Sequence, residues 1–266
     1  MAQIYVGIGG WDYDPWRETF YPPDVPKRAQ LHYASRKLTA IEVNGTFYRL
    51  QSPAVFAKWR DETPAGFIFS LKASRFTTNR RDLREAGESV QKFLSSGITE
   101  LGEKLGPILW QLATTKKFDP EEIDAFLRLL PREQDGVALR HALEVRHESF
   151  MCPEYLAVAR KLGAATVFAD SDEYPSFADV TGDFVYARLM KTVSTQPTGY
   201  TKPALSKWAR RVSEWSAGST PTDLPHVEKK PVKAKPRDVF AFFISGAKER
   251  APAAATRLIE AVRASA

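Results

Sequence analysis

The stretch Ile41-Glu42-Val43-Asn44 alternates apolar with polar side chains, and Leu143-Glu144-Val145-Arg146 and Ala187-Arg188-Leu189 repeat the pattern. Successive side chains of a strand point to opposite faces of its sheet. The strands of an open parallel sheet are covered on both faces and usually read as continuous apolar runs. In a closed barrel, one set of side chains packs under the surrounding helices and the other lines the interior and the mouth. The alternation therefore favours a closed barrel over an open, doubly wound sheet.

Eight segments of the 266-residue chain are short, apolar and rich in β-branched or aromatic residues, which is typical of strands. They are Ile4–Ile8, Ala40–Val43, Phe67–Leu71, Ile108–Leu112, Ala142–Val145, Thr166–Ala169, Phe184–Leu189 and Val239–Ile244. Helical patterns separate most of them, and this alternation implies parallel strands because consecutive parallel strands need a crossover. We predict an α/β fold, a (β/α)8 TIM-barrel-like closed parallel barrel, with residues 1–266 as a single domain.

Helical patterns lie between most of the predicted strands. The longest covers Arg81–Leu105, where apolar residues recur at the spacing of one helix face. Another begins at Asp119, an N-cap residue that a proline follows in the first helical position. Further helices are predicted around Leu205–Trp215 and Ala255–Val262, whereas Ser171–Asp183 carries no good helical pattern.

The composition excludes several classes of protein. The chain carries 38 Lys and Arg against 32 Asp and Glu residues, and 43% of it is hydrophobic, as in globular proteins. No apolar run approaches the ~18 residues of a membrane-spanning helix, and the N-terminal stretch lacks the pattern of a secretory signal. A single cysteine, Cys152, excludes an internal disulfide and a cysteine-based structural zinc site. We predict a cytoplasmic protein with no membrane partner.

The net charge of +6 is concentrated in one segment. From Glu228 to Arg237, five basic residues stand against one acidic residue. The surrounding stretch, 216–236, contains four prolines and few apolar side chains, which is typical of extended surface loops. We predict that 216–236 is a flexible, basic, proline-rich loop inserted before the last strand. Through residues 229–237 it is expected to bind nucleic acid weakly and without sequence preference.

Polar side chains follow seven of the eight predicted strands, at the point where each strand ends. In a (β/α)8 barrel the carboxyl ends of all strands meet on one face, where active sites lie. The predicted ring consists of Trp11, Glu42, Asn44, Lys72, Gln111, Glu144, Arg146, His147, Asp170 and Arg188. Burying so many polar groups lowers stability unless they are used, so we interpret the ring as a ligand site. The alternative is a salt-bridge layer that satisfies itself and closes the barrel.

The ring contains the groups that acid–base chemistry on an anion requires. Burial moves a carboxyl pKa towards neutrality, and His147 is either a proton shuttle or a structural histidine. The candidate catalytic residues are Glu42, Glu144, Asp170 and His147. Cationic groups hold an anionic substrate, and arginine does so with two parallel hydrogen bonds. The candidate substrate-binding residues are Lys72, Arg146 and Arg188, with Trp11, Asn44 and Gln111 beside them.

No metal site and no cofactor are predicted. The chain has four histidines, of which only His147 lies at a strand exit, and multinuclear hydrolase centres usually take more imidazole ligands than that. A single Mg²⁺ held by carboxylates is compatible with the ring.

Motifs along most of the chain carry a family resemblance. They are Gly9-Gly10-Trp11 with Tyr13 and Trp16, Phe20-Tyr21-Pro22, Ile41-Glu42-Val43-Asn44 with Thr46-Phe47-Tyr48-Arg49, Phe69-Ser70-Leu71-Lys72, Leu105-Gly106-Pro107 with Gln111, Glu144-Val145-Arg146-His147, Asp170, Tyr186 with Arg188, and Tyr200. On these residues the chain resembles the YecE-like family, catalogued as domain of unknown function 72. The resemblance implies a TIM-barrel-like fold for the whole chain and adds Tyr200 to the substrate-binding candidates. It implies no established activity.

The chain departs from the pattern of that family at three places. Thr77-Thr78-Asn79 stands where the family tends to carry Thr-His, and Leu189-Met190-Lys191 where it tends to show His-Gly-Arg. At the exit of the last strand, Phe243-Ile244-Ser245-Gly246 replaces the usual Phe-Asn-Asn. These departures put the identity of the ligand, or its turnover, in question.

From these patterns we predict an enzyme of hydrolase, lyase or isomerase type that acts on a small anionic substrate through carboxylate acid–base chemistry. Two alternatives from other classes stay open. One is a nucleic-acid-binding or phosphodiester-cleaving protein, to which the basic loop would contribute. The other is a catalytically silent ligand-binding or scaffold protein, for which the three departures speak.

Overall fold

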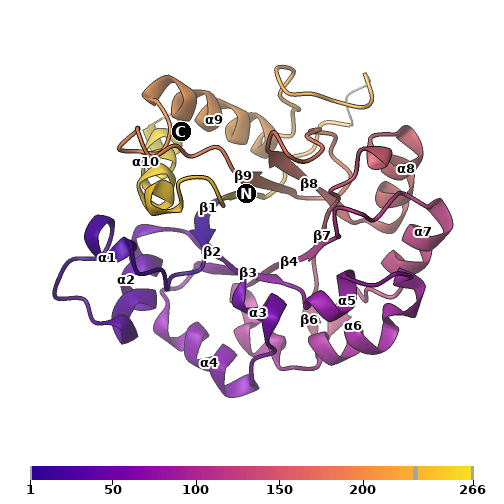
Figure 1. The fold of residues 1–266 in the computed structure, drawn as a ribbon, viewed down its shortest axis with the longest axis horizontal. Helices are drawn as coiled ribbons and strands as arrows, with labels where there is room; N and C mark the ends of the chain where they lie inside the picture. Colours follow the sequence, from indigo (N-terminus) through magenta and orange to yellow (C-terminus); the bar gives the residue numbers. More distant parts are fainter. Residues whose placement is uncertain (1, 230–232, 265–266) are drawn as a thin grey trace.

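The computed structural model describes residues 2–229 and 233–264 (Figure 1). Its barrel strands are β1 (Ile4–Gly9), β2 (Ala40–Val43), β3 (Ile68–Lys72), β4 (Leu105–Gln111), β7 (His141–Glu144), β8 (Ala165–Asp170), β9 (Val185–Leu189) and β10 (Val239–Phe243). Each strand pairs in parallel with its neighbours, and β10 pairs with β1 to close the ring. The predicted closed parallel barrel is confirmed, and each predicted strand overlaps one of these strands.

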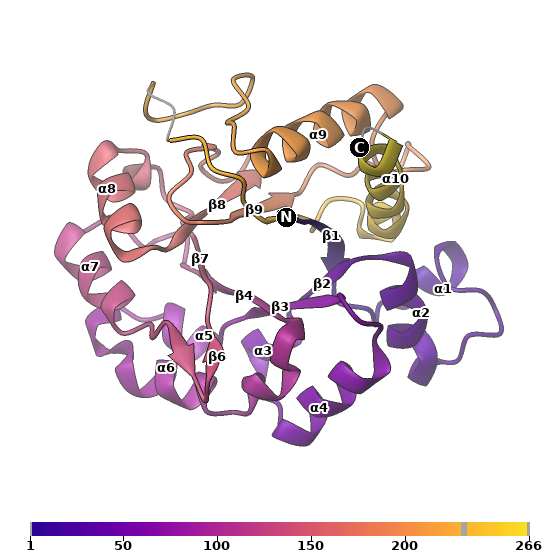
Figure 2. The same ribbon diagram turned by 180° about the vertical axis from the view of Figure 1, so that it is seen from behind.

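Helices surround the barrel on its outer side (Figures 1 and 2). The longer ones are α2 (Gln30–Lys37), α4 (Pro53–Glu62), α6 (Gly87–Leu94), α7 (Pro120–Arg128), α8 (Pro153–Leu162), α9 (Lys202–Ser216) and α10 (Ala251–Ala264). Single turns form α1 (Trp16–Thr19), α3 (Gly45–Tyr48) and α5 (Arg75–Thr78). Helix α7 begins as predicted, because Asp119 accepts hydrogen bonds from two backbone N–H groups of its first turn. No helix of the described residues is both long and apolar enough to cross a membrane.

The prediction of one helix over Arg81–Leu105 is wrong. The segment folds as a 3₁₀ turn, then α6, then an irregular 3₁₀ stretch over Ile98–Lys104. The break lies at Gly97, whose φ of 100° is in the left-handed region that favours glycine. This glycine also lies against Pro53 of α4, since a Cβ added to it would come within 2.6 Å of the proline. The apolar spacing continues across the break, and for that reason the pattern resembled one helix.

A short hairpin between β4 and β7 was not predicted. Strands β5 (Glu133–Gln134) and β6 (Val137–Ala138) pair antiparallel. Both turn residues between them, Asp135 and Gly136, have positive φ, of 49° and 76°. An Asp-Gly dipeptide is a standard signal for such a two-residue turn. By contrast, the predicted lack of a helix in Ser171–Asp183 is confirmed, since all of that segment is described and none of it is helical.

Side chains of one parity fill the inside of the barrel. This inner layer is apolar and consists of Ala40, Ile68, Leu109, Ala142, Ala165, Val167, Phe184, Tyr186, Phe240, Phe242 and Ile244. A second, larger apolar cluster lies between the strands and the helices. Counting two residues onward from the inner layer puts Glu42, Gln111, Glu144 and Arg188 at the carboxyl end of the barrel interior, and counting four onward from Ile68 puts Lys72 there. The core therefore determines which polar side chains meet at the mouth.

Much of the segment 216–236 makes contacts with the barrel's amino end. The backbone N–H of Ala178 donates to Pro225, and the N–H groups of Val227 and Glu228 donate to Asp179 at 2.8 and 3.0 Å. Lys230, Pro231 and Val232 lie outside the described residues. The flexibility of this segment stays a prediction.

Gly97→Ala is expected to lower the free energy of unfolding by about 2–4 kcal/mol. A left-handed backbone costs an L-residue about 1–2 kcal/mol, and overpacking against Pro53 adds about 1–3 kcal/mol. Gly136→Ala is the matched control, because its φ is also positive while the space around it is open. Urea denaturation of both variants measures the difference. Equal losses of stability in the two variants would show that the contact with Pro53 does not stabilise the break between the two helical segments.

Candidate active site

A buried arginine joins two glutamates across the mouth of the barrel. Glu42 of β2 and Glu144 of β7 are fully buried, and Arg188 of β9 is 2% exposed. Nε and Nη2 of the arginine donate to Glu42 at 3.1 and 3.0 Å, and Nη1 donates to Glu144 at 2.7 Å. We call this the Glu42–Arg188–Glu144 network. All three guanidinium nitrogens are engaged.

Four further side chains donate to the two carboxylates. Tyr186 and Asn44 donate to Glu42 at 2.8 and 3.0 Å. Gln111 and Arg146 donate to the other glutamate at 2.7 and 3.0 Å. The structure thus brings together six of the predicted ring residues, which are Glu42, Asn44, Gln111, Glu144, Arg146 and Arg188. Within this group, donors and acceptors satisfy one another, as a self-satisfied layer requires.

Glu144 and Arg188 hold their charges at neutral pH. Burial acts to raise the pKa of Glu144, but Arg188 and Arg146 outweigh burial and hold that pKa below its usual value. Burial also acts against the charge of Arg188, yet the two carboxylates raise its pKa above the ordinary value. The predicted shift of a carboxyl pKa towards neutrality therefore does not occur at Glu144. This carboxylate is a poor proton donor at pH 7.

Lys72 is a cation of the mouth without a partner. It ends β3 and is 8% exposed, and its ammonium group forms no hydrogen bond or ion pair with any described residue. Its Nζ lies 4.2 Å from the centre of the Phe47 ring. Burial lowers the pKa of Lys72 to about 8, and Arg188 and Arg146 act in the same direction. The two glutamates of the network oppose this shift only in part.

Arg146 connects the network to the segment between β8 and β9. Its guanidinium group lies 4.0 Å from the centre of the Tyr174 ring while Nη2 pairs with Glu144 at 2.9 Å. The arginine side chain is 15% exposed, so one edge of it faces solvent. A movement of the connecting segment would therefore alter the surroundings of the network.

Asp170 and Tyr200 lie apart from the network. Ala165 and Val167 of β8 point into the barrel, so Asp170 has the opposite parity and points outward. Its carboxylate lies 3.4 Å from the hydroxyl of Tyr200 and 3.6 Å from Nζ of Lys191. Burial raises the pKa of Asp170, and Lys191 offsets this only in part. These two candidates form a separate polar cluster with Lys191.

His147 and Trp11 take part in local packing. Nδ1 of His147 accepts from the backbone N–H of Ser149 at 3.2 Å and so caps the 3₁₀ turn that follows. Trp11 packs edge-on against Trp59 of α4 at 5.1 Å and against Phe69 of β3 at 6.4 Å. The contact of Nδ1 is the one expected of a structural histidine. Trp11 packs between β3 and α4.

Sequence reasoning missed four side chains at the mouth. Tyr186 precedes the network arginine by two residues and shares its inward face, and Ser70 stands in the same relation to Lys72. The hydroxyl groups of Tyr186 and Ser70 lie 2.8 Å apart. Counting back by two from each charged residue would have found both. Phe47 and Tyr174 lie on connections between strands, where no periodicity places a side chain.

Within the described ranges, no group of three or more His, Cys, Asp or Glu side chains is arranged to hold a metal ion. The carboxylates of Glu42 and Glu144 both face Arg188. A Mg²⁺ ion at this pair would have to displace the guanidinium group, so the mouth does not fit the cation in its present arrangement.

The sequence was also compared with known families and structures. The profile of the family described as "Protein of unknown function DUF72" matches residues 5–266. The chain belongs to the DUF72 family. This DUF72 protein is 29% identical over 150 residues to the UPF0759 protein YecE of Escherichia coli K12, and 27% identical over 158 residues to the UPF0759 protein YunF of Bacillus subtilis 168. These alignments cover 55% and 57% of the chain and 50% and 54% of those relatives, which is about half their length.

The fold of this DUF72 protein is similar to a crystal structure of a DUF72 family protein from Thermotoga maritima MSB8. The TM-score is 0.74 at 21% sequence identity, and the superposition covers 98% of this chain and 99% of that chain. At this level of sequence identity, the structural similarity shows that the two proteins share a fold and shows nothing more.

The three departures from the YecE-like pattern lie on the face that carries the network. Thr77 and Thr78 are buried in α5, directly after β3. The departures at 189–191 and 243–246 lie at the carboxyl ends of β9 and β10. Thr192, which directly follows the first of them, donates through its hydroxyl to the backbone oxygen of Ser245 in the second, at 3.1 Å. Ser245 has a φ of 65°, which is unusual for a residue other than glycine. This DUF72 protein therefore differs from the pattern at the mouth while it keeps the network.

Arg188→Met is expected to lower the free energy of unfolding by about 3–5 kcal/mol at pH 8, because it removes an ion pair from each of two buried carboxylates and leaves only Glu144 with a second one, to Arg146. Their pKa values in the folded variant would then rise above the unfolded values. The folded variant would bind protons more readily, so the loss should shrink as the pH falls towards 5. Urea denaturation at pH 5 and pH 8 measures both effects. Arg257→Met, at an exposed ion pair with Glu260, should change stability by less than about 0.5 kcal/mol.

A small, pH-independent loss for Arg188→Met would contradict the assignment of the network as the structural closure of the mouth.

Lys72→Met is expected to raise the free energy of unfolding at pH 7 by up to about 3 kcal/mol, the equivalent of the depressed pKa. In the wild type the unfolded chain binds this proton more tightly, so stability should rise with pH from about 8 to about 10.5. The variant lacks this rise, and the two stability curves should converge at the upper end. Urea denaturation at pH 7, 9 and 10.5 tests this.

Lys104→Met is the matched control for that substitution. Lys104 is only partly buried, and it donates to the backbone oxygens of Arg60 and Thr63 at 2.5 and 2.6 Å. Its removal leaves acceptors unsatisfied and should lower stability at pH 7. A loss of similar size for Lys72→Met would show that Lys72 has a stabilising partner.

Proposed function

We propose that this DUF72 protein is an enzyme of lyase or isomerase type that acts on a small anionic substrate at the barrel mouth. The observation that carries the proposal is Lys72, a residue only 8% exposed whose ammonium group forms no hydrogen bond or ion pair with a described residue. A buried cation without a partner lowers stability. An anionic group of a substrate would supply the missing partner.

Lys72 has the properties of a residue that both binds and transfers a proton. With a pKa of about 8, Lys72 is mostly an ammonium ion at physiological pH, and a minor fraction is the neutral amine. A catalytic group is most effective when its pKa lies near the working pH. The amine form can remove a proton next to a carbonyl or carboxylate group, and the ammonium form can return it. The reaction then needs no change in the charge of the network.

The network contributes to this function through position and charge. Glu42 and Glu144 hold Arg188 in place, and the arginine lowers the pKa of Lys72. Proton transfer by carboxylates, which the sequence suggested, is less well supported because both glutamates accept several hydrogen bonds and the pKa of Glu144 is lowered. The solvent-facing edge of Arg146 and the Phe47 ring are further substrate contacts near Lys72.

A protein that binds a ligand without turning it over is the second candidate. The mutual satisfaction of the network favours it, since a mouth closed by its own ion pairs has no free carboxylate base. Binding of nucleic acid through residues 229–237 is a further proposal, and the exposed side chains of Lys233 and Lys235 favour it.

The test follows the side chain of Lys72 itself. Protein labelled with ¹³C-lysine is titrated by NMR, and a resonance absent from Lys72→Met should titrate with a midpoint near pH 8. Addition of oxalate or inorganic phosphate should raise this midpoint by at least half a pH unit, because a bound anion favours the ammonium form. The Lys104 resonance, assigned with Lys104→Met, is the control and should not respond to the anions.

A Lys72 midpoint near 10.5, or a midpoint near 8 that neither anion moves, would overturn the proposal. Anion binding without exchange of substrate protons for deuterium, in a panel of 2-oxo and 2-hydroxy carboxylates, would favour the second candidate.

A further inference from the structure

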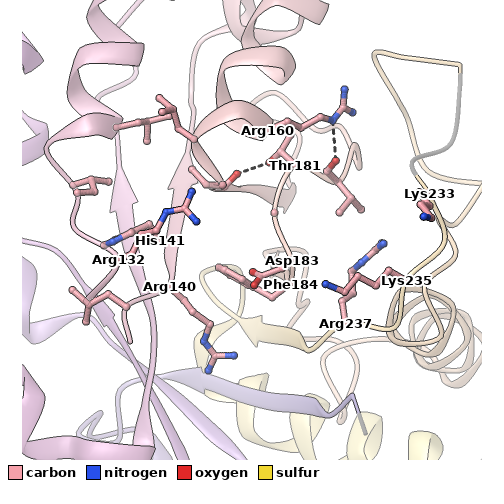
Figure 3. Close-up of a pocket in the computed structure, with 18 residues that line it drawn as sticks. Arg132, Arg140, His141, Arg160, Thr181, Asp183, Phe184, Lys233, Lys235 and Arg237 are labelled. Atoms are coloured by element: carbon pink, nitrogen blue, oxygen red, sulfur yellow. Dashed lines mark hydrogen bonds between the residues drawn. The ribbon is translucent and has the colours of Figure 1, made fainter. Parts of the chain in front are cut away.

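A cavity of about 560 Å³ lies at the other end of the barrel from the network. Its lining residues precede the strands rather than follow them: Arg140 stands before β7, Ala164 before β8, Phe184 before β9 and Arg237 before β10. Figure 3 shows Arg132, Arg140 and His141 on one side of this cavity and Lys233, Lys235 and Arg237 on the other. The site is therefore separate from the one to which we assign the proposed function.

Basic side chains dominate this cavity. Six of its lining residues are Arg or Lys, and only Asp183 is acidic. Arg140 and Arg160 pair with carboxylates at 3.0 and 2.7 Å. The other four, which form no ion pair with any residue in the described part of the chain, are Arg132, Lys233, Lys235 and Arg237. His141 adds no charge, because one ring nitrogen accepts from Trp110 and the other contacts a backbone oxygen.

Arg237 distinguishes this cavity from an ordinary basic surface. It is 5% exposed, its Nη1 is buried without a hydrogen-bond partner, and none of its side-chain nitrogens donates to a described residue. Burial lowers its pKa, with no carboxylate to oppose the shift. Arginine is almost never this deeply buried without a counter-ion. Nη1 of this guanidinium group needs an acceptor that the described residues around it do not supply.

Part of the cavity wall is apolar. Its apolar residues include Leu127, Leu130, Leu139, Leu162, Val180 and Phe184. A volume of about 560 Å³ lies within the ~300–1,000 Å³ range of small-molecule sites, which combine apolar walls with a few charged groups. We propose that this cavity binds a phosphorylated small molecule of nucleotide size, whose phosphate oxygens accept from Arg237 and the neighbouring basic side chains.

The burial of Arg237 argues for a small ligand rather than a nucleic-acid chain. The backbone of a nucleic acid contacts exposed basic groups such as Lys233, Lys235 and Arg132. It does not reach a buried nitrogen such as Nη1 of Arg237. Only a group that enters the cavity satisfies that donor. Active sites of barrels of this type lie at the carboxyl end, so we infer a binding site here rather than a second catalytic centre.

Isothermal titration calorimetry and thermal denaturation in magnesium-free buffer test the proposal, with ADP, inorganic pyrophosphate and adenosine as probes. ADP and pyrophosphate should bind and raise the melting temperature, whereas adenosine should do neither. Arg237→Met should weaken ADP binding at least tenfold, and Arg237→Lys should recover part of it. Because it removes an unpaired buried charge, Arg237→Met should melt at the same temperature as the wild type or higher.

Arg211→Met is the matched control. Arg211 is 9% exposed but pairs with Asp223 at 3.2 Å, so its loss should lower the melting temperature and leave ADP binding unchanged. Arg132→Met, at an exposed position, is a second cavity variant whose folding is not at risk, and it should also weaken ADP binding.

Absence of binding by both phosphorylated probes at millimolar concentration would overturn the proposal. Unchanged ADP affinity in both Arg237→Met and Arg132→Met would do the same. Binding of a ten-residue oligothymidylate in the absence of any ADP or pyrophosphate binding would replace it with a nucleic-acid surface.

Discussion

A guanidinium group shared between two buried carboxylates holds the mouth of this barrel in one arrangement. Arg188 comes from β9, and its partners come from β2, three strands away in one direction, and from β7, two strands away in the other. Burying three charges costs several kcal/mol for each ion, and only a network with every donor and acceptor paired offsets that cost. The pairing therefore requires the three strands to keep their registers, and it leaves Lys72 as a cation of the mouth with no ion pair to a described residue.

The alternation of side chains between the two faces of each strand allowed most of the correct predictions. It correctly put Glu42, Glu144 and Arg188 on the inward face, and the same count finds Tyr186 and Ser70. Applied to β8 it puts Asp170 on the outward face, so this candidate was placed in the ring only because it ends a strand. Which carboxylate pairs with which cation depends on how the barrel closes, and no spacing along the chain contains that information.

Other features depend on contacts between distant segments. The break at Gly97 is set by Pro53, which is far away in the sequence, so the local apolar period continued through it. The Asp135-Gly136 turn carried a readable signal, whereas Phe47 and Tyr174 lie on connections without one. The family departures after β9 and β10 are joined by Thr192, and Ser245 adopts a left-handed backbone there. A residue in that conformation persists only where its surroundings require it, and no local sequence pattern indicates it.

Buried cations elsewhere in the described chain have partners. Lys116 pairs with Glu122 at 2.7 Å and Arg211 pairs with Asp223 at 3.2 Å, although both cations are only 9% exposed. The fold can therefore supply a counter-ion to a buried positive charge. Lys72 and Arg237 are as deeply buried, lack such a partner and lie at opposite ends of the same barrel. Replacing either by an apolar residue would remove a desolvated charge at no loss of an ion pair. These two positions are therefore the ones at which our two proposals place an anion from outside the chain.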